Sequence, residues 1–307
     1  MGFKSGFAAI LGRPNAGKST LVNRLVGQKV AIVSPKPQTT RNRIQGIVNR
    51  DDAQIVLIDT PGIHKPENEL GRQMMEEVRQ ALEALDVLLL IVDASAGFGG
   101  GDRFALEMVK NAKAPAILLL NKVDAIAKER LLPLIDRYSK EHEFVEIIPI
   151  SALTGDGLEI VLDTVVNRLP ESPPYFPPEQ YTDQPERFLA GEIVREKAIV
   201  ASRQEVPYAI AVLVDSFEES AKLIRIRATL YVERDGQKGI LIGKGGAMLK
   251  KIGTEARLEL EELLGTKIFL GLHVKVQEDW RDRPALVRQL DWHRQLERIG
   301  EREESES

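Results

Sequence analysis

The residues GRPNAGKS, at positions 12–19, form the clearest chemical pattern in the chain. The pattern GxxxxGK[ST], set between an apolar strand-like run and a helix-like segment, is matched by Gly12, Gly17, Lys18 and Ser19. The glycines let backbone amides turn toward phosphate groups, the lysine offers a charge to the β and γ phosphates, and the serine hydroxyl can ligate Mg²⁺. We therefore predict a loop that binds nucleotide phosphates, with a ligand-free glycine-rich turn as the alternative.

Two further segments supply candidate groups for the metal and the γ phosphate. The sequence DTPG begins at Asp59 after an apolar run, so Asp59 can hold Mg²⁺ through water while the amide of Gly62 senses the γ phosphate. The polar stretch KPQTTRNR contains Thr39 and Thr40, and we choose Thr40 as the Mg²⁺ ligand of a switch loop. Taken alone, an acidic turn and two solvated threonines would explain these residues equally well.

The motif NKVD, which follows the apolar run AILLL, predicts that the base is guanine. A carboxylate at Asp124 can accept hydrogen bonds from the ring N–H and the exocyclic amine of guanine, whereas adenine would leave it unpaired. Asn121 is expected to brace neighbouring loops, and the aliphatic stem of Lys122 to cover the face of the base. SAL at 151–153 is expected to offer backbone amides to the guanine oxygen.

The predicted site consists of groups that contact the nucleotide and of a subset with a role in hydrolysis or metal binding. The predicted nucleotide-binding residues are Gly12, Arg13, Pro14, Asn15, Ala16, Gly17, Lys18, Ser19, Thr20, Asp59, Thr60, Pro61, Gly62, Ile63, Asn121, Lys122, Asp124, Ser151, Ala152 and Leu153. The predicted catalytic residues are Lys18, Thr40, Gly62 and Asn15. The predicted Mg²⁺ ligands are Ser19, Thr40 and, through water, Asp59.

A second chemical pattern lies in GILIGKGGAMLKKIG, which begins at Gly239. Its GKGG segment matches a GXXG loop, in which glycines let the backbone press against a sugar-phosphate chain and clamp about four nucleotides. No acidic residue occurs from 236 to 254, although the whole chain has a net charge of -4. We predict local, salt-sensitive RNA binding rather than a glycine-rich helix start with solvated lysines. The predicted RNA-binding residues are Ile242, Gly243, Lys244, Gly245, Gly246, Lys250 and Lys251.

Other residues of the second half bear on the same question. The segment IRIRATLYV alternates with period two, so we expect one buried face and one face on which Arg225 and Arg227 are solvated or bound. Trp280 and Trp292 carry rings that can stack on bases, but we expect both to pack into a core.

The elements that must position the nucleotide site alternate between strands and helices. Apolar runs predict buried parallel strands at 6–11, 54–58, 87–92, 115–120 and 144–150. Helix-like segments lie between them at about 18–27, 69–84, 102–112, 128–140 and 157–168. This alternation predicts an α/β doubly wound domain, whose ligands bind beyond the carboxyl ends of the strands.

The second half predicts a smaller α+β domain. Its expected elements are a helix at 186–201, strands at 207–215 and 222–234, a glycine-rich turn, a helix at 245–264, a strand at 267–277 and a last helix at 284–297.

Closely spaced prolines separate the two halves. They remove backbone donors and favour extended structure, so we expect no packed element there. We place the nucleotide domain at 1–170, the linker at 171–184, the RNA-binding domain at 185–283, and a final helix with a charged tail at 284–307.

Composition excludes several classes of protein. The 307 residues include no cysteine, which excludes disulfides, thiolate metal sites and thiol nucleophiles and fits a reducing cytoplasm. Apolar residues make up 43%, and no apolar run is long enough to span a bilayer. The first residues lack the pattern of a signal peptide.

The order of these motifs across residues 2–168 resembles that of the translation-factor-related GTPases. With the proline-rich linker, the GXXG segment, and the sequences KPQTTR and DTPGIHKP, the chain resembles the Era-like family, which joins a P-loop GTPase domain to a type II KH domain. Ras-like proteins carry a water-orienting glutamine where this chain has Ile63, and the Era-like branch is hydrophobic there. The resemblance therefore implies slow unassisted hydrolysis. Asn15 matches an asparagine that some relatives use to hold K⁺ against the phosphates, with a simple turn residue as the alternative.

The resemblance also implies partners that composition and spacing do not name. These are small-subunit ribosomal RNA near its 3′ end, the assembling small ribosomal subunit, and peripheral association with the inner membrane. We expect GTP or GDP and Mg²⁺ as ligands, K⁺ as a further one, no DNA binding, a monomer and a cytoplasmic location. Two alternatives are a GTPase that regulates an RNA-modifying partner and a pure RNA-binding scaffold whose nucleotide only stabilises the fold.

Overall fold

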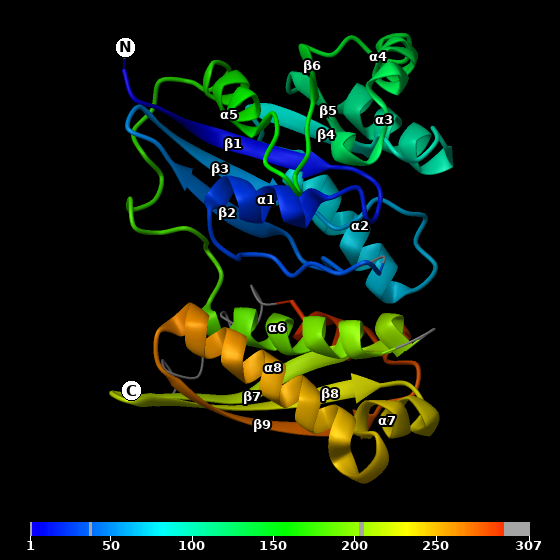
Figure 1. Cartoon of the computed structure of the whole chain (residues 1–307), viewed down its shortest axis with the longest axis vertical. Helices are drawn as coiled ribbons and strands as arrows, with labels where there is room; N and C mark the ends of the chain where they lie inside the picture. The colour runs from blue at the N-terminus through cyan, green and yellow to red at the C-terminus, as the bar shows by residue number, and fades with distance from the viewer. Residues whose placement is uncertain (1, 37–38, 203–205, 292–307) are drawn as a thin grey trace. The chain divides into compact units, whose positions relative to one another are not determined.

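The structure is a computed structural model that describes residues 2–36, 39–202 and 206–291 (Figure 1). The chain divides into two compact units, of which the main part of the first ends at Asp183 and that of the second begins at Gln184. None of the helices in these described ranges is long and apolar enough to cross a membrane.

The first unit is a six-stranded sheet with helices on both faces. Its strands are β1 (Lys4–Leu11), β2 (Ile44–Asn49), β3 (Ala53–Asp59), β4 (Val87–Asp93), β5 (Ala116–Asn121) and β6 (Glu146–Pro149), in the order β2-β3-β1-β4-β5-β6. Its helices are α1 (Lys18–Val26), α2 (Glu69–Ala81), α3 (Gly100–Asn111), α4 (Leu131–Ser139) and α5 (Leu158–Val166). The predicted α/β class is confirmed.

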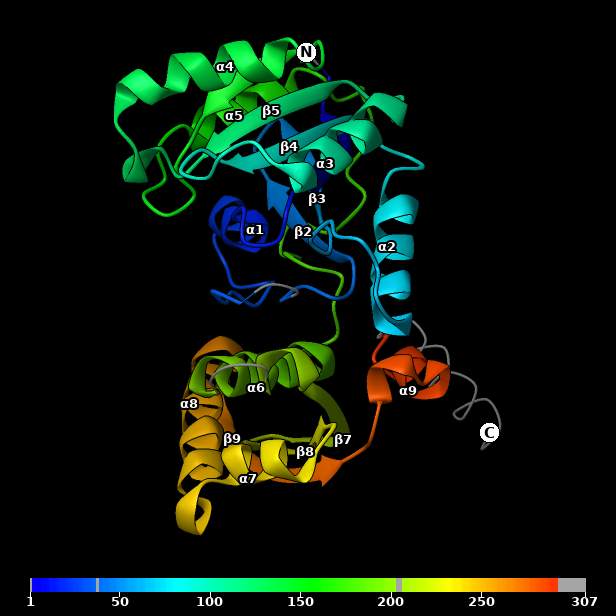
Figure 2. The same cartoon turned by 90° about the vertical axis from the view of Figure 1, so that its right-hand side faces the viewer.

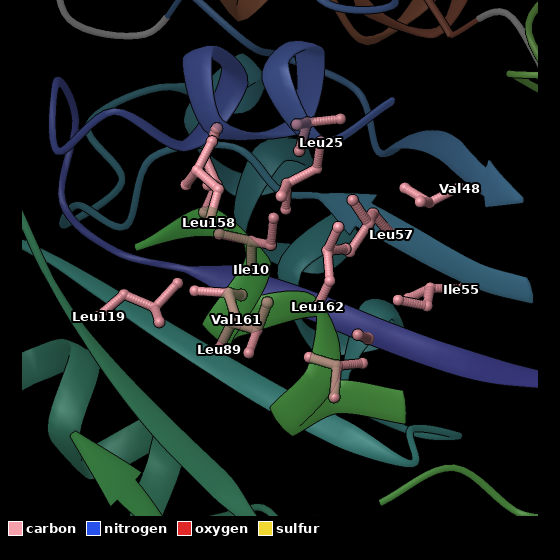
Figure 3. Packing of buried hydrophobic residues seen from close by; sticks show 14 of the residues in the cluster. Ile10, Leu25, Val48, Ile55, Leu57, Leu89, Leu119, Leu158, Val161 and Leu162 are labelled. Atoms are coloured by element: carbon pink, nitrogen blue, oxygen red, sulfur yellow. The ribbon is translucent and has the colours of Figure 1, made fainter. Parts of the chain in front are cut away.

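Alternate strand residues build two cores on opposite faces of this sheet. Ile10 and Leu89 belong to the core covered by α1 and α5, which Figure 3 shows, whereas Leu11 and Leu88 belong to the core covered by α2, α3 and α4. Because both faces are covered, the central strands are apolar at nearly every position. The strand order reverses on either side of β1, so the loop after β1 lies at the switch point where such sheets bind ligands.

The sequence analysis missed β2, the one antiparallel strand of this sheet. It pairs with β3 from Ile44 opposite Asp59 to Asn49 opposite Gln54. No element is predicted for this segment, because it is short, follows a basic stretch and is interrupted by Gly46. An antiparallel strand at an edge needs only one neighbour in the sheet, so its apolar pattern is weak.

The proline-rich segment, which lies wholly within the described residues, contains no helix or strand, as predicted, but it packs on the first unit. Its residues satisfy backbone groups on the outer edge of β2, where the amide of Ile47 donates to the carbonyl of Tyr181 (2.9 Å). The hydroxyl of Thr182 donates to the carbonyl of Gln45 (2.8 Å). The ring of Tyr175 contacts that of Phe7, with centroids 4.8 Å apart. These contacts are long-range in sequence, so local composition did not indicate them.

The second unit has the element order α-β-β-α-α-β followed by a short helix. Its elements are α6 (Glu186–Ala201), β7 (Ala211–Ser220), β8 (Leu223–Val232), α7 (Asp235–Ile242), α8 (Ala247–Leu264), β9 (Lys267–Val276) and α9 (Pro284–Gln289). β8 pairs with β7 antiparallel and with β9 in parallel. One core joins α6, α7 and α8 to one face of this sheet, whose strands Figure 2 shows from the side. The predicted α+β class is confirmed.

Three details of the second unit differ from or extend the predictions. The expected glycine-rich turn contains a helix, α7, which begins before Gly236 and ends at Ile242, directly before Gly243. The last helix, predicted for 284–297, ends at Gln289, while Trp292 and the rest of the predicted helix lie outside the described residues. Trp280 is fully buried, as predicted, and its indole N–H donates to the carbonyl of Ala209 (2.8 Å).

We predict that Gln54→Ala releases the proline-rich segment. The Gln54 side chain is buried, its Oε1 accepts from the amides of Tyr175 (2.8 Å) and Phe176 (3.0 Å), and its Nε2 donates to the carbonyl of Phe176 (2.8 Å). Alanine leaves these groups unpaired, so the free energy of unfolding should fall by about 1–3 kcal/mol. Hydrogen exchange should quicken at residues 175–176 and stay unchanged in Gln80→Ala, which alters an exposed glutamine on α2.

Candidate functional site

Lys18 is the buried centre of the phosphate-binding loop. It begins α1, directly after Gly17, and its Nζ donates to the carbonyls of Gly12 (3.1 Å) and Arg13 (3.0 Å). Burial lowers the pKa of Lys18 to about 8, an effect that the nearby carboxylate of Asp59 opposes. A phosphate entering the loop would add negative charge beside this buried ammonium group.

Two glycines of the loop are required by close approach. Gly17 has a φ of 104°, and a Cβ there would lie 2.2 Å from Nδ2 of Asn121. A Cβ on Gly12 would lie 2.3 Å from the carbonyl oxygen of Ile91, at the end of β4. The glycines thus bring the loop against β4 and β5 as well as freeing backbone amides.

Three oxygen-bearing side chains predicted as metal ligands meet beside Lys18. The hydroxyl of Ser19 lies 2.8 Å from that of Thr40 and donates to Oδ2 of Asp59 (2.8 Å), and the Thr40 hydroxyl lies 3.3 Å from the same oxygen. Asp59 is fully buried, and its Oδ1 has no hydrogen-bond partner among the described residues. Burial raises the pKa of Asp59, while Lys18 and the two hydroxyls act in the opposite direction.

This cluster fits Mg²⁺ in the chemistry of its donors. Hydroxyl and carboxylate oxygens are the ligands that Mg²⁺ prefers, and Mg²⁺ keeps several waters when it binds. The unpaired Oδ1 of Asp59 offers an acceptor for one such water. The contacts also favour Thr40 over Thr39, because Thr40 is the threonine that reaches Ser19 and Asp59.

The DTPG segment lies directly against the phosphate-binding loop. The hydroxyl of Thr60 donates to the carbonyl of Ile10 (2.6 Å), and the amide of Ile63 donates to the carbonyl of Gly12 (3.2 Å). A Cβ on Gly62 would lie 2.9 Å from Cα of Pro14, so only glycine allows this approach. The side chain of Ile63 is 1% exposed and packs in the core beneath α2, so it presents no group that could orient water.

The predicted guanine-binding residues come together at the ends of β5 and β6. The side chain of Asn121 donates to the carbonyl of Ala16 (2.8 Å) and accepts from the amide of Ala152 (2.9 Å). Asn121 therefore braces the two loops, as expected. The hydroxyl of Ser151 donates to Oδ1 of Asp124 (2.6 Å), which orients the carboxylate predicted to read the base.

Asp93 is a functional candidate that the sequence analysis missed. Its Oδ2 accepts from Nζ of Lys122 (2.6 Å), and the contact anchors the end of the side chain whose stem is expected to cover the base. Burial by itself would raise the pKa of Asp93, but hydrogen bonds from Lys122 and Ser95 outweigh this effect and lower the pKa. The one available signal was its place at the end of β4, beside β5 in the sheet.

Asp102 is a second missed candidate. It is buried on α3, and its Oδ1 lies 3.0 Å from Nε of Arg13 in the phosphate-binding loop. Its other oxygen accepts from the amide of Gly99 (2.8 Å), which caps the helix. Burial and then the charge of Asp102 raise the pKa of the Tyr138 phenol, which also hydrogen-bonds to Asp102. A glycine three residues before an aspartate predicts a helix cap, but not its contact with Arg13.

The GXXG segment joins α7 to α8 as an exposed loop. Gly243, Gly245 and Gly246 all have positive φ values, of 72°, 59° and 81°. A Cβ on Gly243 would lie 2.7 Å from that of Met248, whereas one on Gly245 would meet nothing within 4 Å. Lys244, Gly245, Lys250 and Lys251 are exposed, while Ile242, Gly243 and Gly246 are partly buried. The loop thus presents backbone and positive charge to solvent at the start of α8.

The remaining predicted residues surround the phosphate-binding loop and the guanine end. Asn15 is exposed with a φ of 62°, Pro14 and Thr20 are partly buried, and Pro61 is buried. Leu153 is 69% exposed, and its carbonyl accepts from Arg24 of α1 (2.7 Å).

We predict that Asp102→Asn weakens nucleotide binding, although Asp102 is not one of the residues predicted to contact the nucleotide. The substitution removes the charge that holds Arg13, whose carbonyl accepts from Lys18. The loss should cost about 1 kcal/mol of binding, so the Kd for GDP should rise about 5-fold in titration calorimetry. Asp136→Asn, which changes an exposed ion pair with Lys140, serves as the control and should bind like the wild type. Equal affinity for both variants would contradict the role assigned to Asp102.

Comparison with known proteins matches both units. Residues 7–122 match the family described as 50S ribosome-binding GTPase, and residues 205–281 match the KH domain family. A crystal structure of Era in complex with MgGDPNP and nucleotides 1506–1542 of 16S ribosomal RNA is 44% identical, with a TM-score of 0.92 over 94% of this chain and 99% of that one. A tyrosine-to-alanine variant of Era from Aquifex aeolicus bound to GDP·AlF4⁻ is also 44% identical, with a TM-score of 0.90 over the same shares of the two chains. With this identity over nearly the whole length of both proteins, the chain belongs to the Era family of GTPases.

Proposed function

We propose that this GTPase binds small-subunit ribosomal RNA near its 3′ end through the GXXG loop and assists maturation of the small ribosomal subunit. One observation carries the proposal: the chain combines a braced guanine-nucleotide site with an exposed basic GXXG loop. The Era structure with a GTP analogue and 16S ribosomal RNA supports this choice of RNA.

Nucleotide binding in this proposal uses the preformed contacts of the first unit. Lys18 donates to the β and γ phosphates, and Asp124, held by Ser151, accepts from the guanine edge. Ser19 and Thr40 would hold Mg²⁺, with Asp59 acting through water, and the ion would supply charge stabilisation to the phosphates. Because Ile63 is buried and apolar, the attacking water must be oriented by backbone or by a further group, so unassisted hydrolysis is slow.

Two loops connect the nucleotide state to RNA binding in this proposal. Thr40 and the amide of Gly62 are the groups expected to detect the γ phosphate, and hydrolysis removes that contact.

We propose residues 1–170 as the nucleotide domain, 171–184 as the linker, 185–283 as the RNA-binding domain and 284–307 as a final helix and tail. We place the protein in the cytoplasm as a monomer, and the family resemblance supports peripheral association with the inner membrane.

Gly245→Asp should separate RNA binding from nucleotide binding. The position is exposed and has a φ of 59°, so the substitution adds both strain and a negative charge where the phosphate chain is clamped. The Kd for nucleotides 1506–1542 of 16S ribosomal RNA should rise at least about 10-fold in a fluorescence anisotropy titration, with the Kd for GDP unchanged.

Gly27→Asp is the matched control for this variant. Gly27 also has a positive φ, of 78°, and open space around its Cβ position, but it lies in the first unit. It should bind this RNA like the wild type. The wild type should bind RNA with an affinity that depends on the bound nucleotide. If its RNA affinity were the same without nucleotide, with GDP and with a GTP analogue, the protein would be an RNA-binding scaffold whose nucleotide only stabilises the fold.

We also propose that K⁺ binds beside Asn15 and accelerates hydrolysis. The supporting observation is that Asn15 is exposed in the phosphate-binding loop, with a φ of 62°. GTP hydrolysis should be about 10-fold faster in K⁺ than in Na⁺, a change of about 1.4 kcal/mol in the barrier. The difference should vanish in Asn15→Ala. A wild-type rate that is the same in both salts would refute the K⁺ site.

A further inference from the structure

One face of the sheet in the second unit is not part of the core formed with α6, α7 and α8. In β8 and β9, inward residues such as Ile226 and Ile268 are buried in that core, whereas their neighbours alternate to the other face. On this second face Phe269 is 54% exposed, although phenylalanine is among the residues most often buried.

A slot lies beside the Phe269 ring because the neighbouring position on the same face is a glycine. Phe269 pairs with Arg225, and Gly271 pairs with Arg227, in the register of β8 and β9. A Cβ on Gly271 would lie 3.7 Å from Cγ of Arg227 and 3.7 Å from Cε1 of Phe269. The absent side chain therefore leaves room for about one methyl group between the aromatic ring and the arginine stem.

Positive charge surrounds this slot. Arg225 and Arg227 are exposed, and within the described parts of the chain neither makes an ion pair. Lys275 is exposed on the same face of β9, as is Lys267, whose Nζ lies 3.6 Å from Oε2 of Glu261 on α8. The carboxylates of this face lie toward β7, where Glu218 pairs in register with Arg225 and Asp215 accepts from the Thr229 hydroxyl (2.8 Å). The β9 side of the sheet is thus basic and aromatic.

We propose that this face is a second binding surface for single-stranded RNA, on which a base stacks on Phe269 beside Arg227. Aromatic rings on an open sheet stack unpaired bases, arginine planes add to the stack, and basic neighbours follow the phosphates. An apolar protein partner would match the ring but not the charges around it. The proposal extends the proposed RNA-binding function and rests on it.

The GXXG loop and this slot lie at opposite ends of α8. The loop precedes Ala247, and Phe269 lies shortly after Leu264, the end of this helix of 18 residues, which is about 27 Å long. A clamp of about four nucleotides does not cover that distance together with the turn into β9. An RNA that reaches the second surface must therefore be longer than four nucleotides and continue beyond the GXXG loop.

The test compares RNA affinity of Phe269→Leu with that of Leu258→Ala, using nucleotides 1506–1542 of 16S ribosomal RNA as the probe. Leucine keeps an apolar side chain on the strand but removes the ring, and Leu258 is a similarly exposed apolar residue (53%) on α8. Loss of one stacked base should raise the Kd at least about 5-fold. Leu258→Ala should match the wild type, and ultraviolet crosslinking followed by mass spectrometry should identify the peptide that contains Phe269.

A second variant tests the slot while retaining the ring. The Cβ of Gly271→Val would lie in ordinary contact with Arg227 and Phe269, without a clash, so the sheet should keep its melting temperature while the Kd for RNA rises. Wild-type affinity in both Phe269→Leu and Gly271→Val, with affinity lost in Gly245→Asp, would overturn the second surface and leave the GXXG loop standing. If RNA affinity were lost in Phe269→Leu and Gly271→Val but kept in Gly245→Asp, the result would support RNA binding by the sheet and overturn RNA binding by the GXXG loop.

Discussion

The nucleotide site depends on two opposite charges buried side by side at the ends of β1 and β3. Lys18 and Asp59 are each costly to bury, and each is stabilised by the other and by hydrogen bonds from the loops around them. Glycines at positions 12 and 17 let the backbone approach closely enough to form those bonds. The arrangement leaves Oδ1 of Asp59 unpaired within the described structure, and phosphate and metal would complete it.

Much of this site could be predicted because its parts follow local rules. The phosphate-binding loop, DTPG, NKVD and SAL each follow an apolar strand. Because parallel strands end at the same edge of the sheet, these motifs could be predicted to lie close together. The phosphate-binding loop and the bracing by Asn121 were predicted in this way, whereas Thr40 was chosen from its place in the polar stretch after the loop's helix. The GXXG loop was recognisable for the same reason, since its glycines and lysines are contiguous.

The features that were missed all depend on partners distant in sequence. Asp102 holds Arg13 across 89 positions (102 − 13), and Gln54 reaches residues of the proline-rich segment across more than 100. β2 is defined by pairing with β3 and by the chain segment on its other edge rather than by its own composition. α7 was hidden by its glycines, whose low helix propensity is outweighed by packing of Leu241 into the core.

The contact between β2 and the proline-rich segment also has a consequence for synthesis of the chain. An uncovered strand edge is a template for pairing with another chain, and the groups that cover β2 come from Tyr181 and Thr182, after all six strands of its sheet. The first unit therefore emerges from the ribosome with its edge open until about 130 further residues have been added after β2. For that interval, protection from mispairing rests on the shortness of β2 and the glycine at its centre.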